Sequence, residues 1–142
     1  MNRCVFCEGD GGELVWRNHV CRVVFAGEPD YPGFMRVVLN AHVKEMTDLS
    51  ASDRIEVMRV VFAVEAAIRQ VMRPDKINIA NLGNKVPHIH WHVVPRYVDD
   101  PHFPNPVWSI KRRERTQVPI PNLNAQLVQA LTKQLATLQP VA

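Results

Sequence analysis

The amino-acid sequence predicts an α+β fold, in which an antiparallel sheet of about five strands packs with one main helix and a C-terminal helix. Three observations predict this class. Short runs rich in β-branched and aromatic residues, joined by short connections, occupy roughly the first 40 positions. A long run with helical spacing of apolar residues follows over residues 51–72, and a second pair of strand-like runs comes after it. Strands joined by short hairpin connections indicate an antiparallel sheet.

The expected strands cover residues 14–17, 20–25, 34–39, 76–81 and 88–97. The first two are joined around Asn18-His19. The segment 27–33 is rich in glycine and proline, which favour turns, and it separates the second strand from the third.

Two helices are expected. Ser50 is a suitable N-cap for the first, and Asp53 places an acid in its first turn. Pro74 bounds this helix, so it should run over residues 51–72. Its expected core stripe consists of Ile55, Met58, Phe62, Ala66 and Ile68. The second helix should cover residues 122–138, with Leu127, Leu131, Leu135 and Leu138 on one side.

The composition fits a single domain over residues 1–142, with 46% hydrophobic and 22% charged residues. No apolar run approaches the ~20 residues of a membrane span, and the first residues lack the apolar core of a secretion signal. We therefore expect a cytoplasmic protein with no membrane partner. The net charge of +3 suits a phosphate-bearing substrate. The basic cluster 111–115 is interpreted as a solvated segment, so no nucleic-acid partner is expected.

Three of the six histidines lie within five residues, at His88, His90 and His92. Alternation on a strand places them on one face and turns Ile89, Trp91 and Val93 toward the core. The outer two are roughly 13 Å apart along a strand, which is too far for all three to bind one metal ion. The row suits an extended anionic substrate, with a neutral imidazole as nucleophile and protonated neighbours binding anionic oxygens. A solvent-facing strand that happens to carry histidines is the simpler alternative.

This pattern, His-φ-His-φ-His-φ-φ with φ apolar, resembles the signature of the histidine triad (HIT) superfamily of nucleotidyl hydrolases and transferases. The resemblance continues into Pro95-Arg96, and it extends upstream to the segments 78–83 and 32–42. It covers about residues 4–97 and leaves 98–142 as a less diagnostic loop and C-terminal helix. It implies a HIT-like fold whose sheet continues across a homodimer.

The resemblance also implies a reaction. His90 would attack the α-phosphate of a nucleotide and form a nucleotidyl–histidine intermediate, from which water would then release the nucleotide monophosphate. His92 would hold a phosphate oxygen or pass a proton to the leaving group. Asn81 would donate to the phosphate, and Gly83 would form a tight turn or offer its backbone amide. The implied substrates are dinucleoside polyphosphates such as diadenosine tetraphosphate, nucleoside phosphoramidates and adenylylated compounds, with no metal required for chemistry.

Three positions depart from the family pattern. Phe34 occupies the place of a fourth histidine found in many relatives. The residues 84–87 replace a Gly-Gln-Ser/Thr-Val segment, so that Lys85 is either a charge on a phosphate or a solvated loop residue. The residue that holds the ribose in relatives falls near Ala26, and Glu28 is a nearby substitute.

Cys4 and Cys7 form a Cys-x-x-Cys pair, which can chelate zinc, act as a redox couple or simply be two small apolar residues. No strand–helix–strand pattern follows them to support the redox interpretation. The resemblance implies that His42 and His88 complete a four-ligand structural zinc site. His88 is then a metal ligand; otherwise it remains a phosphate-binding member of the triad.

Two other functions remain open at this stage. One is a metal enzyme that uses a His-x-His pair on a strand, with a third ligand from a neighbouring strand. The other is a nucleotide-binding regulatory protein with little catalysis, because Phe34 replaces the fourth histidine. The irregular segment 97–108 is expected either over the mouth of the site or in a subunit interface.

Overall fold

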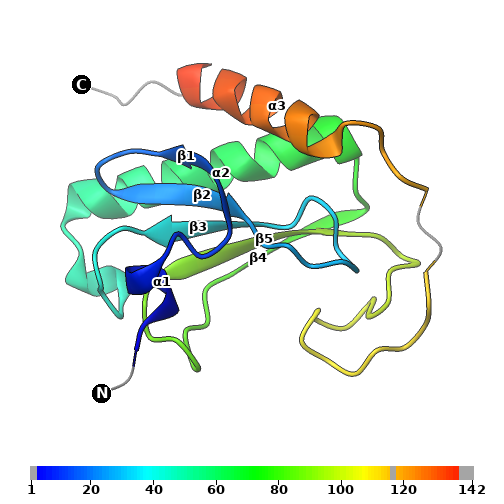
Figure 1. The fold of residues 1–142 in the computed structure, drawn as a ribbon, viewed down its shortest axis with the longest axis horizontal. Helices are drawn as coiled ribbons and strands as arrows, with labels where there is room; N and C mark the ends of the chain where they lie inside the picture. The colour runs from blue at the N-terminus through cyan, green and yellow to red at the C-terminus, as the bar shows by residue number, and fades with distance from the viewer. Residues whose placement is uncertain (1–2, 116–117, 138–142) are drawn as a thin grey trace.

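The computed structural model describes residues 3–115 and 118–137, and it confirms the α+β class (Figure 1). Five strands form one antiparallel sheet in the order β1-β2-β3-β5-β4. The strands are β1 (Glu13–Arg17), β2 (Cys21–Phe25), β3 (Met35–Leu39), β4 (Lys76–Ala80) and β5 (His90–Arg96). The helices are α1 (Val5–Glu8), the 3-10 turn η1 (Met46–Asp48), α2 (Ala51–Met72) and α3 (Leu123–Thr137).

Helix α2 has the boundaries that its capping signals predict. The Ser50 hydroxyl accepts the backbone N–H of Asp53 at 3.2 Å, which satisfies one free donor of the first turn. Arg73 ends the helix in the left-handed conformation, with φ 49°, directly before Pro74. Both signals are local in sequence, which is why they locate the ends correctly.

The buried face of α2 differs from the expected stripe. Ile55 and Phe62 are 71% and 54% exposed, so their assignment to the core was wrong. The residues buried against the sheet and α3 include Val57, Val60 and Val64. Apolar residues occur on more than one side of this helix, and spacing alone does not say which side meets the sheet. The expected position Leu138 of the second helix lies outside the described residues.

The two faces of the sheet have different neighbours (Figure 1). Helices α2 and α3 cover one face and form the main core with residues such as Val37, Ile89 and Val93. Phe6 of α1 packs on the opposite face against Val24 and Val38. No helix in the described part of the chain is long and apolar enough to cross a membrane.

The strand register aligns the histidine row with β3. His90 pairs with Val38 and His92 pairs with Arg36, so these side chains share the face opposite α2. Ile89 and Val93 belong to the main core and Trp91 packs against it, as the alternation predicts. β5 begins at His90 and not at residue 88, because the chain at His88 turns toward the end of β3.

Candidate active site

His90 is held in one tautomer by the backbone. Its Nδ1 lies 2.6 Å from the carbonyl oxygen of His88. A carbonyl can only accept a hydrogen bond, so Nδ1 carries the proton and Nε2 of the neutral ring carries the lone pair. Burial lowers the pKa of His90 below its ordinary value, although the hydrogen bond to His88 opposes this. The imidazole is therefore neutral near pH 7, with a nucleophilic nitrogen.

His92 is also a neutral imidazole. Burial, together with the fields of His90 and Arg36, lowers its pKa to about 4. Its ring meets that of His90 edge-on at 4.9 Å, and its buried Nδ1 has no hydrogen-bond partner among the described residues. The sequence-based expectation of protonated histidines flanking the middle one is thus wrong for neutral pH, because the strand is too deeply buried to hold those charges.

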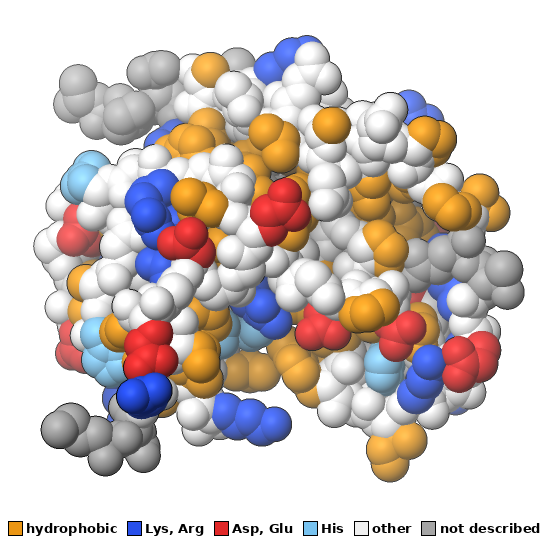
Figure 2. Space-filling view, in the orientation of Figure 1, with side chains coloured by type: hydrophobic (Ala, Val, Ile, Leu, Met, Phe, Trp, Pro, Cys, Tyr) orange, Lys and Arg blue, Asp and Glu red, His pale blue; other side chains and the backbone are white. Residues whose placement is uncertain are grey.

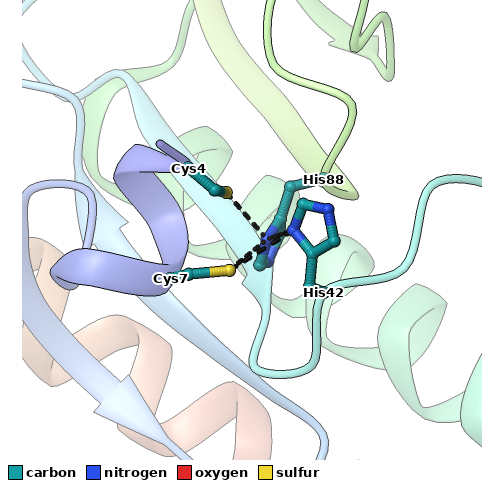
Figure 3. A group of neighbouring side chains, drawn as sticks. All are labelled: Cys4, Cys7, His42 and His88. Carbon is teal, nitrogen blue, oxygen red and sulfur yellow. Dashed lines mark hydrogen bonds between the residues drawn. The ribbon is translucent and has the colours of Figure 1, made fainter. Parts of the chain in front are cut away.

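His88 belongs to a different group of side chains (Figure 3). Its Nδ1 lies 3.3 Å from Cys4 Sγ, 3.6 Å from Cys7 Sγ and 3.2 Å from His42 Nδ1. Cys7 Sγ is also 3.3 Å from His42 Nδ1, and all four ligand atoms lie within 4.8 Å of one another. Residues separated by more than 80 positions thus meet around one point.

The donor set fits a tetrahedral metal ion. Zinc bonds of 2.0–2.3 Å to nitrogen and sulfur place neighbouring ligand atoms roughly 3.3–3.8 Å apart, close to the distances among these residues. His88 Nε2 lies 2.6 Å from the carbonyl oxygen of Leu39 and donates to it, which leaves Nδ1 unprotonated toward the cysteines. Both ring nitrogens of His88 are therefore engaged, and the geometry does not support its alternative role as a phosphate ligand.

The remaining predicted site residues lie on loops around the row. Asn81 directly follows β4, is partly buried and makes no side-chain hydrogen bond within the described structure. Gly83 has φ 72°, a left-handed backbone conformation that favours glycine. Lys85 is exposed, and Glu28 is an exposed residue that lines a cavity whose Phe34 and Trp108 contact His92.

That cavity has a volume of about 260 Å³ and is lined by residues of two segments, 28–36 and 102–108. Trp108 meets the His92 ring edge-on at 5.1 Å, and Phe34 does so at 5.7 Å. The segment after β5 therefore lies over the mouth of the histidine row, one of the two positions expected for it.

Three neighbours of the row were not assigned to the site from the sequence. Phe6 packs on the His90 ring at 4.6 Å, Trp108 covers His92, and Arg36 stands opposite His92 on β3. Arg36 was detectable, because it is a charge within an otherwise apolar strand. Phe6 and Trp108 come from distant segments and carry no local signal.

Comparison with known proteins identifies the family. The HIT domain model matches residues 11–99, more than half of the chain, and the chain belongs to this family. The AP-4-A phosphorylase of Mycobacterium tuberculosis is 33% identical over 98 residues, which cover 65% of this chain and 50% of that protein. The asymmetrical bis(5'-nucleosyl)-tetraphosphatase of Schizosaccharomyces pombe is 26% identical over 91 residues, or 61% of this chain and 50% of that protein. The chain spans about half the length of these curated relatives.

Solved structures agree on the fold. A histidine triad protein from Sinorhizobium meliloti has a TM-score of 0.69 at 25% identity, covering 88% of this chain and 90% of its own. A zinc-bound histidine triad family protein from Mycobacterium smegmatis has a TM-score of 0.65 at 24% identity, covering 94% and 96%. The second likeness shows the shared fold alone.

Proposed function

We propose that this protein is a nucleotide hydrolase or transferase that cleaves a phosphoanhydride or phosphoramidate bond at an α-phosphate. The observation that carries the proposal is the 2.6 Å hydrogen bond from His90 Nδ1 to the His88 carbonyl. It leaves Nε2 as a neutral nucleophile in a family whose curated relatives are named for action on dinucleoside polyphosphates. Substrates of this kind, or adenylylated compounds, are the proposed class.

In the proposed mechanism, His90 Nε2 attacks the α-phosphorus, and the bond to the leaving group breaks with its electron pair on that group. A phosphate departs as the anion, whereas an amine takes up a proton as it departs. Water then attacks the nucleotidyl–histidine, releases the nucleotide and restores the free imidazole. His92 supplies a neutral N–H to a phosphate oxygen, since its low pKa excludes a charged ring near pH 7. Asn81 and the backbone at Gly83 are proposed to contact the phosphate. Glu28 is proposed to accept ribose hydroxyls, and Lys85 remains a solvated residue or a remote phosphate contact.

We also propose that Cys4, Cys7, His42 and His88 hold a structural zinc, and that zinc takes no part in the chemistry. The metal would bind α1 to the ends of β3 and β5. The competing His-x-His metal enzyme is not supported, because the ligand cluster found among the described residues contains neither His90 nor His92.

A homodimer that extends the sheet through an edge strand, β1 or β4, is a further proposal. Light scattering would test it, because a dimer has twice the 16.2 kDa mass of the chain.

The decisive experiment is incubation with adenosine phosphoramidate or diadenosine tetraphosphate, followed by intact-protein and peptide mass spectrometry. Adenylate should be found on the peptide that contains His90 after acid-free quenching. His90→Ala should lose turnover by several orders of magnitude while its circular dichroism spectrum stays unchanged, because no other neutral nitrogen occupies the same place.

His19→Ala is the matched control, since His19 is an exposed histidine in the turn between β1 and β2. It should retain full turnover and the adenylated species. Wild-type rates in His90→Ala, or adenylate on another residue, would refute the nucleophile assignment. Binding of nucleotides without any turnover would instead identify a regulatory binding protein.

A further inference from the structure

Arg36 is a cation on the same face of the sheet as the histidine row. It pairs with His92 across β3 and β5, so the two Cα atoms are roughly 4.5–5.5 Å apart and both side chains leave the sheet in the same direction. His90 is the next member of that face along β5. Arg36 therefore lies level with His92, one histidine further along the row than His90, the proposed nucleophile.

The guanidinium group of Arg36 has no ionic partner in residues 3–115 and 118–137, the part of the chain that the structure describes. It is half-buried and rests 5.3 Å above the Phe34 ring, but no oxygen of the described residues lies within hydrogen-bond or ion-pair distance of it. The Glu28 carboxylate acts on the guanidinium group through its longer-range field and forms no ion pair with it. Buried and half-buried arginines are normally paired, because a desolvated charge without a partner is costly.

The Arg36 side chain lines an open cavity and is not enclosed in the packed core. Arg36 lines the 260 Å³ cavity together with the aromatic residues Tyr31, Phe34 and Trp108, and two carboxylates, Glu28 and Asp30, also line it. Arg36 is the one arginine or lysine among the described residues that line this cavity. Figure 2 shows a hollow on this side of the molecule, between the sheet and the segment after β5, with basic and histidine side chains beside it. The neighbouring His92 is 7% exposed, and its Nδ1 has no hydrogen-bond partner among the described residues, so a second polar group beside the cavity is free to bind a ligand.

We propose that Arg36 binds a phosphate of the leaving group, and that the enzyme therefore prefers substrates whose leaving group is itself a phosphate or polyphosphate. This inference rests on the proposed function, because it places the α-phosphate at His90. When Nε2 bonds to the α-phosphorus, the bridging P–O bond breaks and its electron pair stays on the departing polyphosphate. A planar guanidinium binds such phosphate oxygens in a bidentate manner and offsets the charge that develops there.

The test compares two substrates in the 142-residue chain. Diadenosine tetraphosphate has a polyphosphate leaving group, whereas adenosine phosphoramidate has an amine in its place. Arg36→Leu should lower kcat/KM for the tetraphosphate about 10- to 100-fold, the range expected for a charge-assisted hydrogen bond, and change the phosphoramidate rate less than about threefold. Arg36→Lys should recover part of the loss, since it restores the charge without the bidentate fork.

Arg69→Leu is the matched control, because it removes one positive charge from an exposed position on α2, which covers the opposite face of the sheet. It should leave both rates unchanged. Equal losses for the two substrates in Arg36→Leu, or no loss for either, would overturn the proposal.

A binding measurement separates this inference from the proposed reaction. Inorganic tripolyphosphate should bind the wild-type protein in calorimetry, and Arg36→Leu should weaken that binding at least tenfold while Arg69→Leu does not. If neither nucleotide is turned over but Arg36→Leu still weakens tripolyphosphate binding, the anion site at Arg36 is supported and the proposed reaction is refuted. If tripolyphosphate binds both Arg36 forms equally, or binds neither, the Arg36 site is refuted whatever the enzyme turns over.

Discussion

At the residue scale, the backbone and the side chain of His88 make contacts with different groups. The carbonyl of His88 accepts the proton on His90 Nδ1, while its ring faces the two cysteines. One residue therefore joins the fixed tautomer of the proposed nucleophile to the metal-ligand cluster. The burial that makes this arrangement rigid also keeps the rings of His88, His90 and His92 neutral, because it lowers all three pKa values.

These lowered pKa values predict that the protein loses stability in mild acid. An unfolded histidine takes up a proton near pH 6.5, whereas folded His92 does so only near pH 4. Between these values the unfolded chain binds more protons, so the free energy of unfolding falls as the pH drops from about 6.5 to about 4. Urea titrations at pH 7.0, 6.0 and 5.0 should show a smaller decline in His92→Gln than in the wild type.

His19→Gln is the control for this titration, because that histidine is exposed in the β1–β2 turn. It should follow the wild-type decline. A slope for His92→Gln as steep as that of the wild type would contradict the pKa assignment.

At the element scale, the end of β5 anchors the segment that covers the site. Arg96 is 2% exposed and binds both oxygens of Asp100, at 2.8 and 3.1 Å. It also donates to Asn78 and to the carbonyl of Asn105, so it ties β4 and the covering segment together. Burial opposes the charge of Asp100, but hydrogen bonds from Arg96 and from three backbone N–H groups hold the pKa of that carboxyl well below its usual range.

Arg96→Met should therefore reduce the free energy of unfolding by about 3–5 kcal/mol, because it leaves the Asp100 carboxylate buried without its cation. Urea unfolding at pH 7 measures the change. Arg17→Met removes the exposed ion pair with Asp10 and should cost less than about 1 kcal/mol. Similar losses of unfolding free energy in the two variants would show that the Arg96–Asp100 pair does not anchor the segment after β5.

At the scale of the whole molecule, the proposed zinc site connects parts of the chain that are far apart in sequence. Cys4 is the N-cap residue of α1 and Cys7 lies within that helix, whereas His42 follows β3 and His88 precedes β5. α1 has only four residues, too few for a stable helix by itself, and its contacts with the sheet run mainly through Phe6 and Arg22. A metal would hold this corner of the fold closed.

Zinc should therefore raise the melting temperature of the wild-type protein by several degrees, since it binds the folded chain in preference to the unfolded one. Cys7→Ser should lose the bound zinc, measured by elemental analysis, and should no longer respond to added metal. His90→Ala should keep both the metal and the response. Loss of zinc in His90→Ala with retention in Cys7→Ser would place the metal in the histidine row and overturn the assignment.

The sequence by itself determined the features whose causes are local. The capping residue Ser50 and the left-handed end before Pro74 specify α2, and period-two alternation specifies which way His90, His92 and Trp91 point. The HIT signature is a continuous motif, so its resemblance sufficed for the family, and the resemblance also named the four residues that the structure brings together as a candidate metal site. The positions of Asn81 and Gly83 after β4 followed in the same way.

Only the tertiary structure decided the relations between distant segments. Which side of α2 is buried, and why Ile55 and Phe62 are exposed, depends on how the helix docks on the sheet. Arg36 meets His92 because β3 and β5 pair in one register, and Trp108 reaches the same ring because Arg96 and Asp100 fold the following segment back. The neutral state of the histidines also depends on contacts between distant segments, because it arises from burial by side chains that are remote in sequence. The spacing of residues along one strand does not predict that burial.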